Sequence, residues 1–258
     1  MASFPRPRLA VLGAGFLGRF VADEAWRAGW EVLPVVRSEA SAARLRHEYP
    51  GTMAIDAVES GFWLKHAPAC DGMVWAIAPS RGSSEEEFKR VHNQGAVRAA
   101  EWAGKRKIPF VYISSTSVYA EESGGWVDED SVLATDPRAT AMTEAEQACR
   151  AARGTVLRCA GLYGGERMLA DEGGGPERWL NLVHGQDAAR AVGIALRYRN
   201  RILNVCEDEP RRRGQSGGVW PEGGRRVRRN KRVRNARLRA LGWIPGATRS
   251  EEHTSELQ

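Results

Sequence analysis

Three glycines near the start of the sequence have a spacing that can bind phosphate. Gly13, Gly15 and Gly18 form a G-x-G-x-x-G pattern directly after the apolar run 9–12, and apolar residues then recur at helical spacing. In a strand–turn–helix unit the first glycine permits the tight turn, the second lets a pyrophosphate approach, and the third lets the helix pack closely. The pattern predicts a dinucleotide site; a purely structural turn is the alternative. The expected pyrophosphate residues are Gly13, Gly15, Phe16, Leu17 and Gly18.

Charged residues after the next two expected strands bear on the adenosine half of such a ligand. Arg37 ends the expected strand 31–37, near the distance where an acidic residue would accept the ribose hydroxyl of NAD. A guanidinium instead suits a 2′-phosphate, so Arg37 favours NADP over NAD unless it is an ordinary surface charge. Asp56 follows the expected strand 52–55 and is placed either to accept from the adenine amino group or to cap a helix.

The chain up to about residue 205 alternates short apolar runs with helical patterns. Further strands are expected at 72–78, 110–113, 155–159 and 201–205, and helices at 84–104, 139–152 and 187–197. Strands that alternate with helices favour a parallel sheet covered on both faces. The expected fold class is α/β, a doubly wound parallel sheet (Rossmann fold) with a small C-terminal substrate region. Ligands of such sheets bind at the carboxyl ends of the strands, where the strand order reverses.

The positive charge of the sequence is confined to one segment. The 258 residues carry a net charge of +6, yet residues 211–239 hold twelve Lys or Arg and only one Glu. Residues 1–210 are mildly acidic, with a net charge of −3. The basic segment has no aromatic residue among its cations other than Trp220, so we do not expect the protein to bind nucleic acid.

The composition changes beyond residue 210 and sets the expected domain boundaries. Residues 211–230 are rich in Arg and Gly without an apolar period, as in a solvated linker or in DNA translated out of frame. A helical pattern returns at 231–243, and residues 249–258 look like a translated sequencing adapter. The expected division is a dinucleotide-binding domain over 8–210 with minor substrate-binding elements from about residue 164, a linker or out-of-frame segment over 211–230, and a short helical remnant with a non-native tail over 231–258.

Composition and spacing also argue against several other kinds of protein. No run of about 18 apolar residues is present, so no membrane span is expected. No signal peptide is evident at the N-terminus. The four cysteines are scattered, and neither they nor the histidines have metal-ligand spacing. We therefore expect a cytoplasmic protein with reduced thiols and no metal.

Four ordered motifs make the sequence similar to a known group of proteins. The motifs lie at 13–18, 112–119, 157–164 and 184–191. In this order and spacing they resemble the extended and atypical branches of the short-chain dehydrogenase/reductase superfamily, near the NAD-dependent epimerase/dehydratase group. The resemblance covers roughly residues 8–209, with a weaker echo at 231–245.

The resemblance implies roles for residues at the end of the expected strand 110–113. It implies that Ser115 hydrogen-bonds the reacting oxygen of the substrate, with Thr116 beside it. Tyr119 is a candidate acid, although a tyrosine at this place is more often a packed residue. The residues expected to border the cofactor beyond the glycine turn are Ala76, Ala78 and Leu162.

The sequence departs from this group at the pair that normally transfers the proton. Alignment of the helix 139–152 puts Arg138 where the group has its tyrosine and Met142 where it has its lysine, and no Tyr-x-x-x-Lys occurs in the chain. Arginine cannot release its proton at neutral pH, and methionine relays none. Asn93 resembles the asparagine that orients that lysine or a water.

Two functions follow from an intact cofactor motif without the proton-transfer pair. The first is an NAD(P)-binding oxidoreductase or epimerase-like enzyme, preferring NADP(H), that acts on a small carbonyl or hydroxyl compound or on a sugar nucleotide. The alternative is a non-catalytic dinucleotide sensor or regulatory module. The resemblance also implies a homodimer through the helices 84–104 and 139–152.

Overall fold

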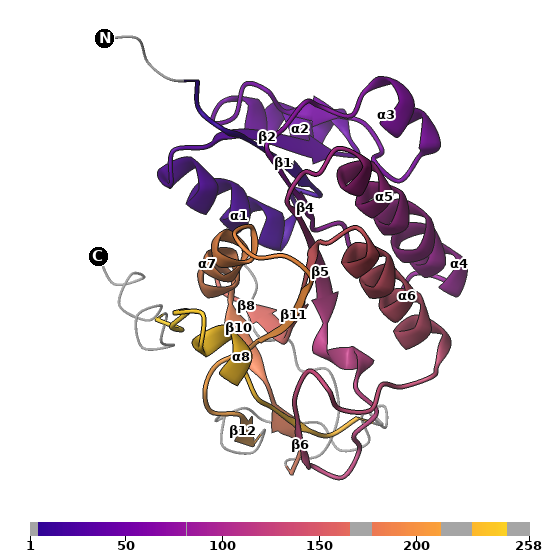
Figure 1. Cartoon of the computed structure of the whole chain (residues 1–258), viewed down its shortest axis with the longest axis vertical. Coiled ribbons are helices and arrows are strands. Elements are labelled where there is room, and N and C mark those ends of the chain that lie inside the picture. The colour runs from indigo at the N-terminus through magenta and orange to yellow at the C-terminus, as the bar shows by residue number, and fades with distance from the viewer. Residues whose placement is uncertain (1–4, 81, 166–176, 213–228, 247–258) are drawn as a thin grey trace.

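A parallel sheet of seven strands forms the centre of the molecule (Figure 1). The structure, a computed structural model, describes residues 5–80, 82–165, 177–212 and 229–246. In spatial order the strands are β11 (Arg201–Val205), β7 (Thr155–Cys159), β5 (Phe110–Ser115), β4 (Gly72–Trp75), β1 (Arg8–Leu12), β2 (Glu31–Val36) and β3 (Met53–Ala54). The chain winds outward in one direction through β2 and β3 and in the other from β4 to β11. The order therefore reverses beside β1, which confirms the expected doubly wound α/β fold.

Helices cover both faces of this sheet (Figure 1). One face packs on α1 (Phe16–Arg27), α2 (Glu39–Arg46) and α7 (Gly185–Ala195). The other packs on α3 (Ser60–Lys65), η1 (Arg90–Ala96), α5 (Val97–Lys105) and α6 (Pro137–Ala151). α4 (Glu85–Lys89) leads directly into η1. The sheet thus separates two hydrophobic cores.

The apolar run in β1 shows why the sheet is buried on both sides. Leu9 and Val11 belong to the core beneath α1 and α7, whereas Ala10 and Leu12 belong to the opposite core. Successive side chains of a strand point to opposite faces, so a strand covered on both sides needs an uninterrupted apolar run. The run in β1 meets this requirement and directs the following glycine turn to the carboxyl edge of the sheet.

Several element boundaries differ from the sequence-based expectations. β2 ends at Val36, β3 is shorter than expected, and β4 ends at Trp75, because the residues after each strand leave the sheet and turn toward a cavity. The expected helix 84–104 contains a π-helical segment, η1. Most of 231–243 is not helical, since only α8 (Ala236–Arg239) forms there after a short strand.

Short strand pairs extend the fold beyond the carboxyl edge of the sheet. They are β8 (Gly161–Tyr163) with β10 (Leu182–His184), β9 (Trp179–Leu180) with β12 (Arg211–Arg212), and β6 (Trp126–Val127) with β13 (Arg232–Val233). η2 (Thr116–Val118) is a 3₁₀ turn directly after β5. Residues 213–228 of the expected segment 211–230, and the whole expected tail 249–258, lie outside the described residues. In the part of the chain that the structure describes, no helix has the length and apolar character needed to cross a membrane.

Candidate functional site

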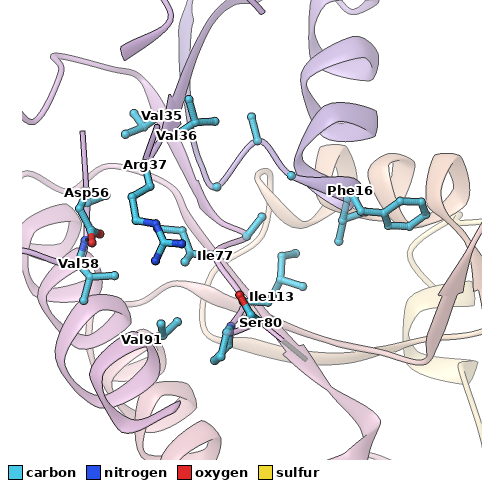
Figure 2. A pocket seen from close by; sticks show the side chains of 18 of the residues that line it. Phe16, Val35, Val36, Arg37, Asp56, Val58, Ile77, Ser80, Val91 and Ile113 are labelled. Carbon is cyan, nitrogen blue, oxygen red and sulfur yellow. Dashed lines mark hydrogen bonds between the residues drawn. The ribbon is translucent and has the colours of Figure 1, made fainter. Parts of the chain in front are cut away.

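A cavity of about 390 Å³ lies at the carboxyl ends of β1 to β5, where the strand order reverses (Figure 2). The turn after β1 forms its floor, and residues after β2, β3 and β4 form its sides. Ile113 of β5 and Leu162 of β8 close the end away from β2 and β3. This is the edge at which open α/β sheets bind their ligands.

The three glycines of the turn have three different environments. Gly13 has a φ of +93°, and a Cβ there would stand 2.6 Å from the Ile77 backbone nitrogen. A Cβ on Gly18 would stand 2.1 Å from the Gly13 carbonyl oxygen, so only glycine permits this helix–turn contact. At Gly15, which caps the N-terminus of α1, a Cβ would meet no heavy atom within 4 Å.

This geometry fits a pyrophosphate. The open space at Gly15 lies at the N-terminus of a helix of 12 residues, whose unpaired backbone N–H groups and dipole favour an anion. The expected cofactor residues that line the cavity are Gly13, Gly15, Phe16, Leu17, Arg37, Asp56, Ala76, Ala78 and Leu162. Gly18 does not line the cavity. Its backbone packs against the Gly13 carbonyl and so holds the turn in place.

Arg37 is an exposed cation at the end of the cavity beside β2. Figure 2 shows its guanidinium directed into the cavity, between Asp56 and Ile77. Within the described residues no carboxylate forms an ion pair with Arg37. Ser41, in the first turn of α2, also lines this end, where its backbone N–H donates to the hydroxyl of the helix cap Ser38.

Asp56 is already engaged by the protein. Its Oδ1 accepts from the Val58 backbone N–H at 3.0 Å, and its Oδ2 lies 3.4 Å from the Arg90 guanidinium. The side chain thus closes the loop after β3, and one carboxylate edge still lines the cavity.

Arg90 is a cavity residue that the sequence reasoning missed. It lies in the π-helical segment η1 and donates to Glu87 at 2.7 Å and to Glu59 at 2.9 Å, besides its contact with Asp56. The hydrogen bond from Arg90 lowers the pKa of Glu87, which therefore stays ionised at the cavity wall. No motif signals Arg90, because two of its partners, Asp56 and Glu59, lie more than 30 residues away in the loop between β3 and α3.

The candidate catalytic residues lie beyond the cavity lining. Ser115 follows Ile113 by two residues and therefore shares its face of β5. The Ser115 hydroxyl oxygen accepts from the Ser117 backbone N–H at 3.1 Å, which leaves its own proton available to donate. Thr116 is 8% exposed and begins the turn η2.

Tyr119 is fully buried and takes part in an ionic network. Its hydroxyl donates to Asn204 at 2.6 Å and accepts from Arg158 at 3.1 Å. Arg158 also donates three hydrogen bonds to Glu146, at 2.6, 3.0 and 3.2 Å, and Glu146 accepts from Ser114 at 2.6 Å. Burial raises the pKa of Tyr119 to about 12. This environment favours a structural role for Tyr119, since the network fixes both ends of the Ser115 turn.

The residues at the positions of the absent proton-transfer pair offer no acid. Arg138 is exposed, donates to the Ser83 carbonyl at 3.0 Å and stacks over Phe88. Met142 is 5% exposed and packs in the core. Asn93 donates to Glu144, while its carbonyl oxygen is buried without a hydrogen-bond partner in the described structure.

Similar folds occur in proteins that bind NAD. The chain is 16% identical to UDP-glucuronic acid 4-epimerase from Bacillus cereus in complex with NAD, with a TM-score of 0.74 over 93% of this chain and 94% of that chain. It is 18% identical to DesIV, a dTDP-glucose 4,6-dehydratase from Streptomyces venezuelae with NAD and DAU bound, with a TM-score of 0.76 over 95% and 94%. A functionally unknown conserved protein from Silicibacter pomeroyi DSS is 24% identical, with a TM-score of 0.68 over 93% and 95%.

The fold and the glycine turn define a nucleotide-binding protein of the Rossmann type. Residues 9–206 match the NAD dependent epimerase/dehydratase family. The chain therefore belongs to that family, as its four motifs implied. A search of curated proteins found no match. Among the described residues, no group of three His, Cys, Asp or Glu side chains is arranged to hold a metal ion.

Proposed function

We propose that the protein is an NADP(H)-dependent oxidoreductase that acts on a small carbonyl or hydroxyl substrate. The observation that carries the cofactor choice is the Arg37 guanidinium, which is directed into the cavity and forms no ion pair within the described residues. A guanidinium recognises the 2′-phosphate of NADP through charge-assisted hydrogen bonds, whereas NAD offers only a hydroxyl there. Ser41 adds a hydroxyl group at the same end.

The remaining cavity residues would hold the rest of the cofactor. Gly15 and the N-terminus of α1 would take the pyrophosphate, and Ala76, Ala78 and Leu162 would border the nicotinamide half. When bound, NADPH supplies a hydride to a carbonyl carbon. Ser115 would donate a hydrogen bond to the carbonyl oxygen of the substrate, because its own oxygen is already held by Ser117.

Calorimetric titration with NADPH and NADH tests the cofactor assignment. We expect the wild-type protein to bind NADPH at least about tenfold more tightly than NADH, because a charged hydrogen bond contributes about 1.5–3 kcal/mol. Arg37→Ala should remove most of this preference, while Arg197→Ala, which removes an exposed arginine elsewhere, should retain it. Equal affinities of the wild type for the two nucleotides would reject the assignment.

Turnover of a panel of carbonyl compounds and sugar nucleotides with NADPH tests the oxidoreductase assignment. We expect Ser115→Ala to reduce kcat by about a hundredfold, as when one donor to a developing oxyanion is removed. Ser117→Ala is the matched control, since it retains the backbone N–H that holds Ser115. An unchanged rate in Ser115→Ala would remove this residue from the reaction.

A dinucleotide sensor is the second candidate, favoured by the side chains at Arg138 and Met142. Neither can exchange a proton at neutral pH, and Tyr119 is sealed inside the molecule. A sensor predicts tight NADPH binding without hydride transfer to any compound of the panel. Substrate-dependent oxidation of NADPH, measured by its absorbance, would exclude the sensor and support the enzyme.

A further inference from the structure

Arg90 lines the cavity with the whole edge of its guanidinium already engaged by carboxylates. Its Nε and Nη2 donate to the two oxygens of Glu87, at 2.7 and 3.1 Å. Its Nη1 donates to Glu59 at 2.9 Å, and Nη1 and Nη2 both donate to Asp56 Oδ2 at 3.4 Å. A guanidinium has five N–H donors, all in its plane, so these five hydrogen bonds occupy its edge.

The flat face of the guanidinium is what Arg90 can then offer to a ligand. The side chain is 27% exposed and belongs to the cavity lining. Arginine stacks on aromatic rings through this face, with the positive charge over the ring. We propose that Arg90 is the stacking platform for the purine base of the dinucleotide.

The surroundings of Arg90 suit a flat and largely apolar group. Four apolar residues line the same part of the cavity wall: Ile55, Ala57, Val58 and Val91. Figure 2 shows Val58 and Val91 at the end where Asp56 and Arg37 also lie. A base at this end would meet apolar side chains and the face of a cation, which together favour stacking.

The position of the glycine turn decides which half of the dinucleotide reaches Arg90. A pyrophosphate at Gly15 leaves one nucleoside on each side of β1. Asp56, which binds Arg90, follows β3 on the side of the sheet that also carries Arg37. This is the adenosine side. The inference therefore rests on the proposed function for the placement of the dinucleotide, but not for the choice between NADP and NAD.

A phosphate does not fit the same face of Arg90. The guanidinium is surrounded by three carboxylates, and one of them, Glu87, lines the cavity as well. The hydrogen bond from Arg90 lowers the pKa of Glu87, so this carboxylate is negative at neutral pH and repels an anion. A phosphate also needs N–H donors, which Arg90 already uses. A neutral base needs neither a donor nor a counter-charge.

Calorimetric titration of Arg90→Lys with NADH and NADPH tests the platform. Lysine keeps the positive charge beside the carboxylates but has no flat face. We expect both nucleotides to bind at least about fivefold more weakly than to the wild type, with the ratio of their two affinities unchanged. Wild-type affinities in Arg90→Lys would overturn the proposal.

A purine without the amino group separates stacking from an effect through Asp56. Reduced nicotinamide hypoxanthine dinucleotide keeps the fused rings but lacks the amino group of adenine. Because stacking uses the rings, Arg90→Lys should weaken the binding of this analogue by the same factor as that of NADH. A loss confined to NADH would mean that Arg90 only orients Asp56 toward the amino group, and would reject a stacking role.

Arg98→Lys is the matched control for the loop after β3. Arg98 of α5 donates to the Val58 carbonyl at 2.9 Å and so holds the same loop, but it does not line the cavity. We expect this variant to bind both nucleotides as the wild type does. An equal loss of affinity in Arg98→Lys and Arg90→Lys would assign the effect to the loop and end the case for Arg90.

A measurement on the wild type does not depend on how a variant folds. At saturating NADH, nuclear Overhauser effects should connect the ring protons of adenine to the Hδ protons of Arg90. If NADH binds and these effects are absent, the role of Arg90 is wrong while the dinucleotide site stands. If neither NADH nor NADPH binds, the proposed function itself fails.

Discussion

Gly15 and Gly18 belong to one motif, but the two positions require glycine for different reasons. A Cβ on Gly18 would collide with the Gly13 carbonyl oxygen at 2.1 Å, so the fold itself requires glycine there. A Cβ built on Gly15 would have no heavy atom within 4 Å, and the backbone φ of Gly15 is negative, at −80°. Alanine therefore fits Gly15 in the unliganded protein, and the ligand that we propose is what excludes it.

Alanine substitutions at the two glycines should separate folding from binding. We expect Gly18→Ala to lower the free energy of unfolding by about 2 kcal/mol or more, as overpacking does. Gly15→Ala should lower it by less than about 1 kcal/mol yet weaken NADPH binding at least tenfold. Urea denaturation and calorimetry measure the two effects. Wild-type NADPH affinity in Gly15→Ala would contradict a pyrophosphate at this position.

Residues close to a strand end were predictable, whereas those brought in from another element were not. Arg37 and Asp56 were selected because each follows an apolar run, and both line the cavity. Arg90 lies 34 residues from its partner Asp56, on the side of a helical segment. Its arrival depends on how η1 packs against the loop after β3, which local spacing does not encode.

At the scale of elements, a buried ion pair joins α6 to strand β7 of the sheet. Glu146 of α6 is 3% exposed and Arg158 of β7 is 2% exposed. Glu146 accepts from Ser114 of β5, and Arg158 reaches Tyr119 beyond the turn η2. One pair therefore fixes a helix, two strands and the turn that carries Ser115.

Breaking this pair should be costly, whereas replacing it should be less so. We expect Arg158→Met to reduce the free energy of unfolding by about 3–5 kcal/mol, because it leaves the Glu146 carboxylate buried without a counter-ion. The double variant Arg158→Met/Glu146→Leu should recover part of that loss. Arg150→Met, on the exposed side of α6, should cost less than about 1 kcal/mol. Equal unfolding midpoints for Arg158→Met and Arg150→Met in urea would show that the pair contributes nothing.

The lengths of elements were less predictable than their order. The sequence predicted all seven strands of the sheet in the correct order along the chain. It did not predict the π-helical segment η1, where Val91 lines the cavity while Ala96 packs in the core. Packing on both the ligand side and the core side decides such a local change of helical geometry, so a periodicity pattern does not reveal it.

At the scale of the whole molecule, the described C-terminal residues return to the main body. Val233, Leu238 and Trp243 are each at most 1% exposed and belong to the core that also contains α1 and α7. The Trp243 indole N–H donates to the Asp187 carbonyl at 2.9 Å. The segment 229–246 therefore completes a core that begins with β1, although the domain boundary at residue 210 stays a prediction.

Substitution in this segment tests whether it stabilises the whole fold. We expect Trp243→Ala to lower the free energy of unfolding by about 3–5 kcal/mol, through the cavity that it leaves in the core. Ile244→Ala, at the neighbouring position with 66% exposure, should change it by less than about 0.5 kcal/mol. A single unfolding transition, shifted only in Trp243→Ala, would show one cooperative unit. An unshifted Trp243→Ala would mean that the segment folds independently of the body.

The sequence by itself determined the glycine turn, the alternation of strands and helices, and the family, because each depends on residues close together in the chain. It also identified Arg37 and the absence of a Tyr-x-x-x-Lys pair. Only the tertiary structure decided that Arg90 reaches the cavity and that the Tyr119 side chain is buried. Those properties arise from contacts between distant segments, whose burial and electrostatics exist only after the elements have packed.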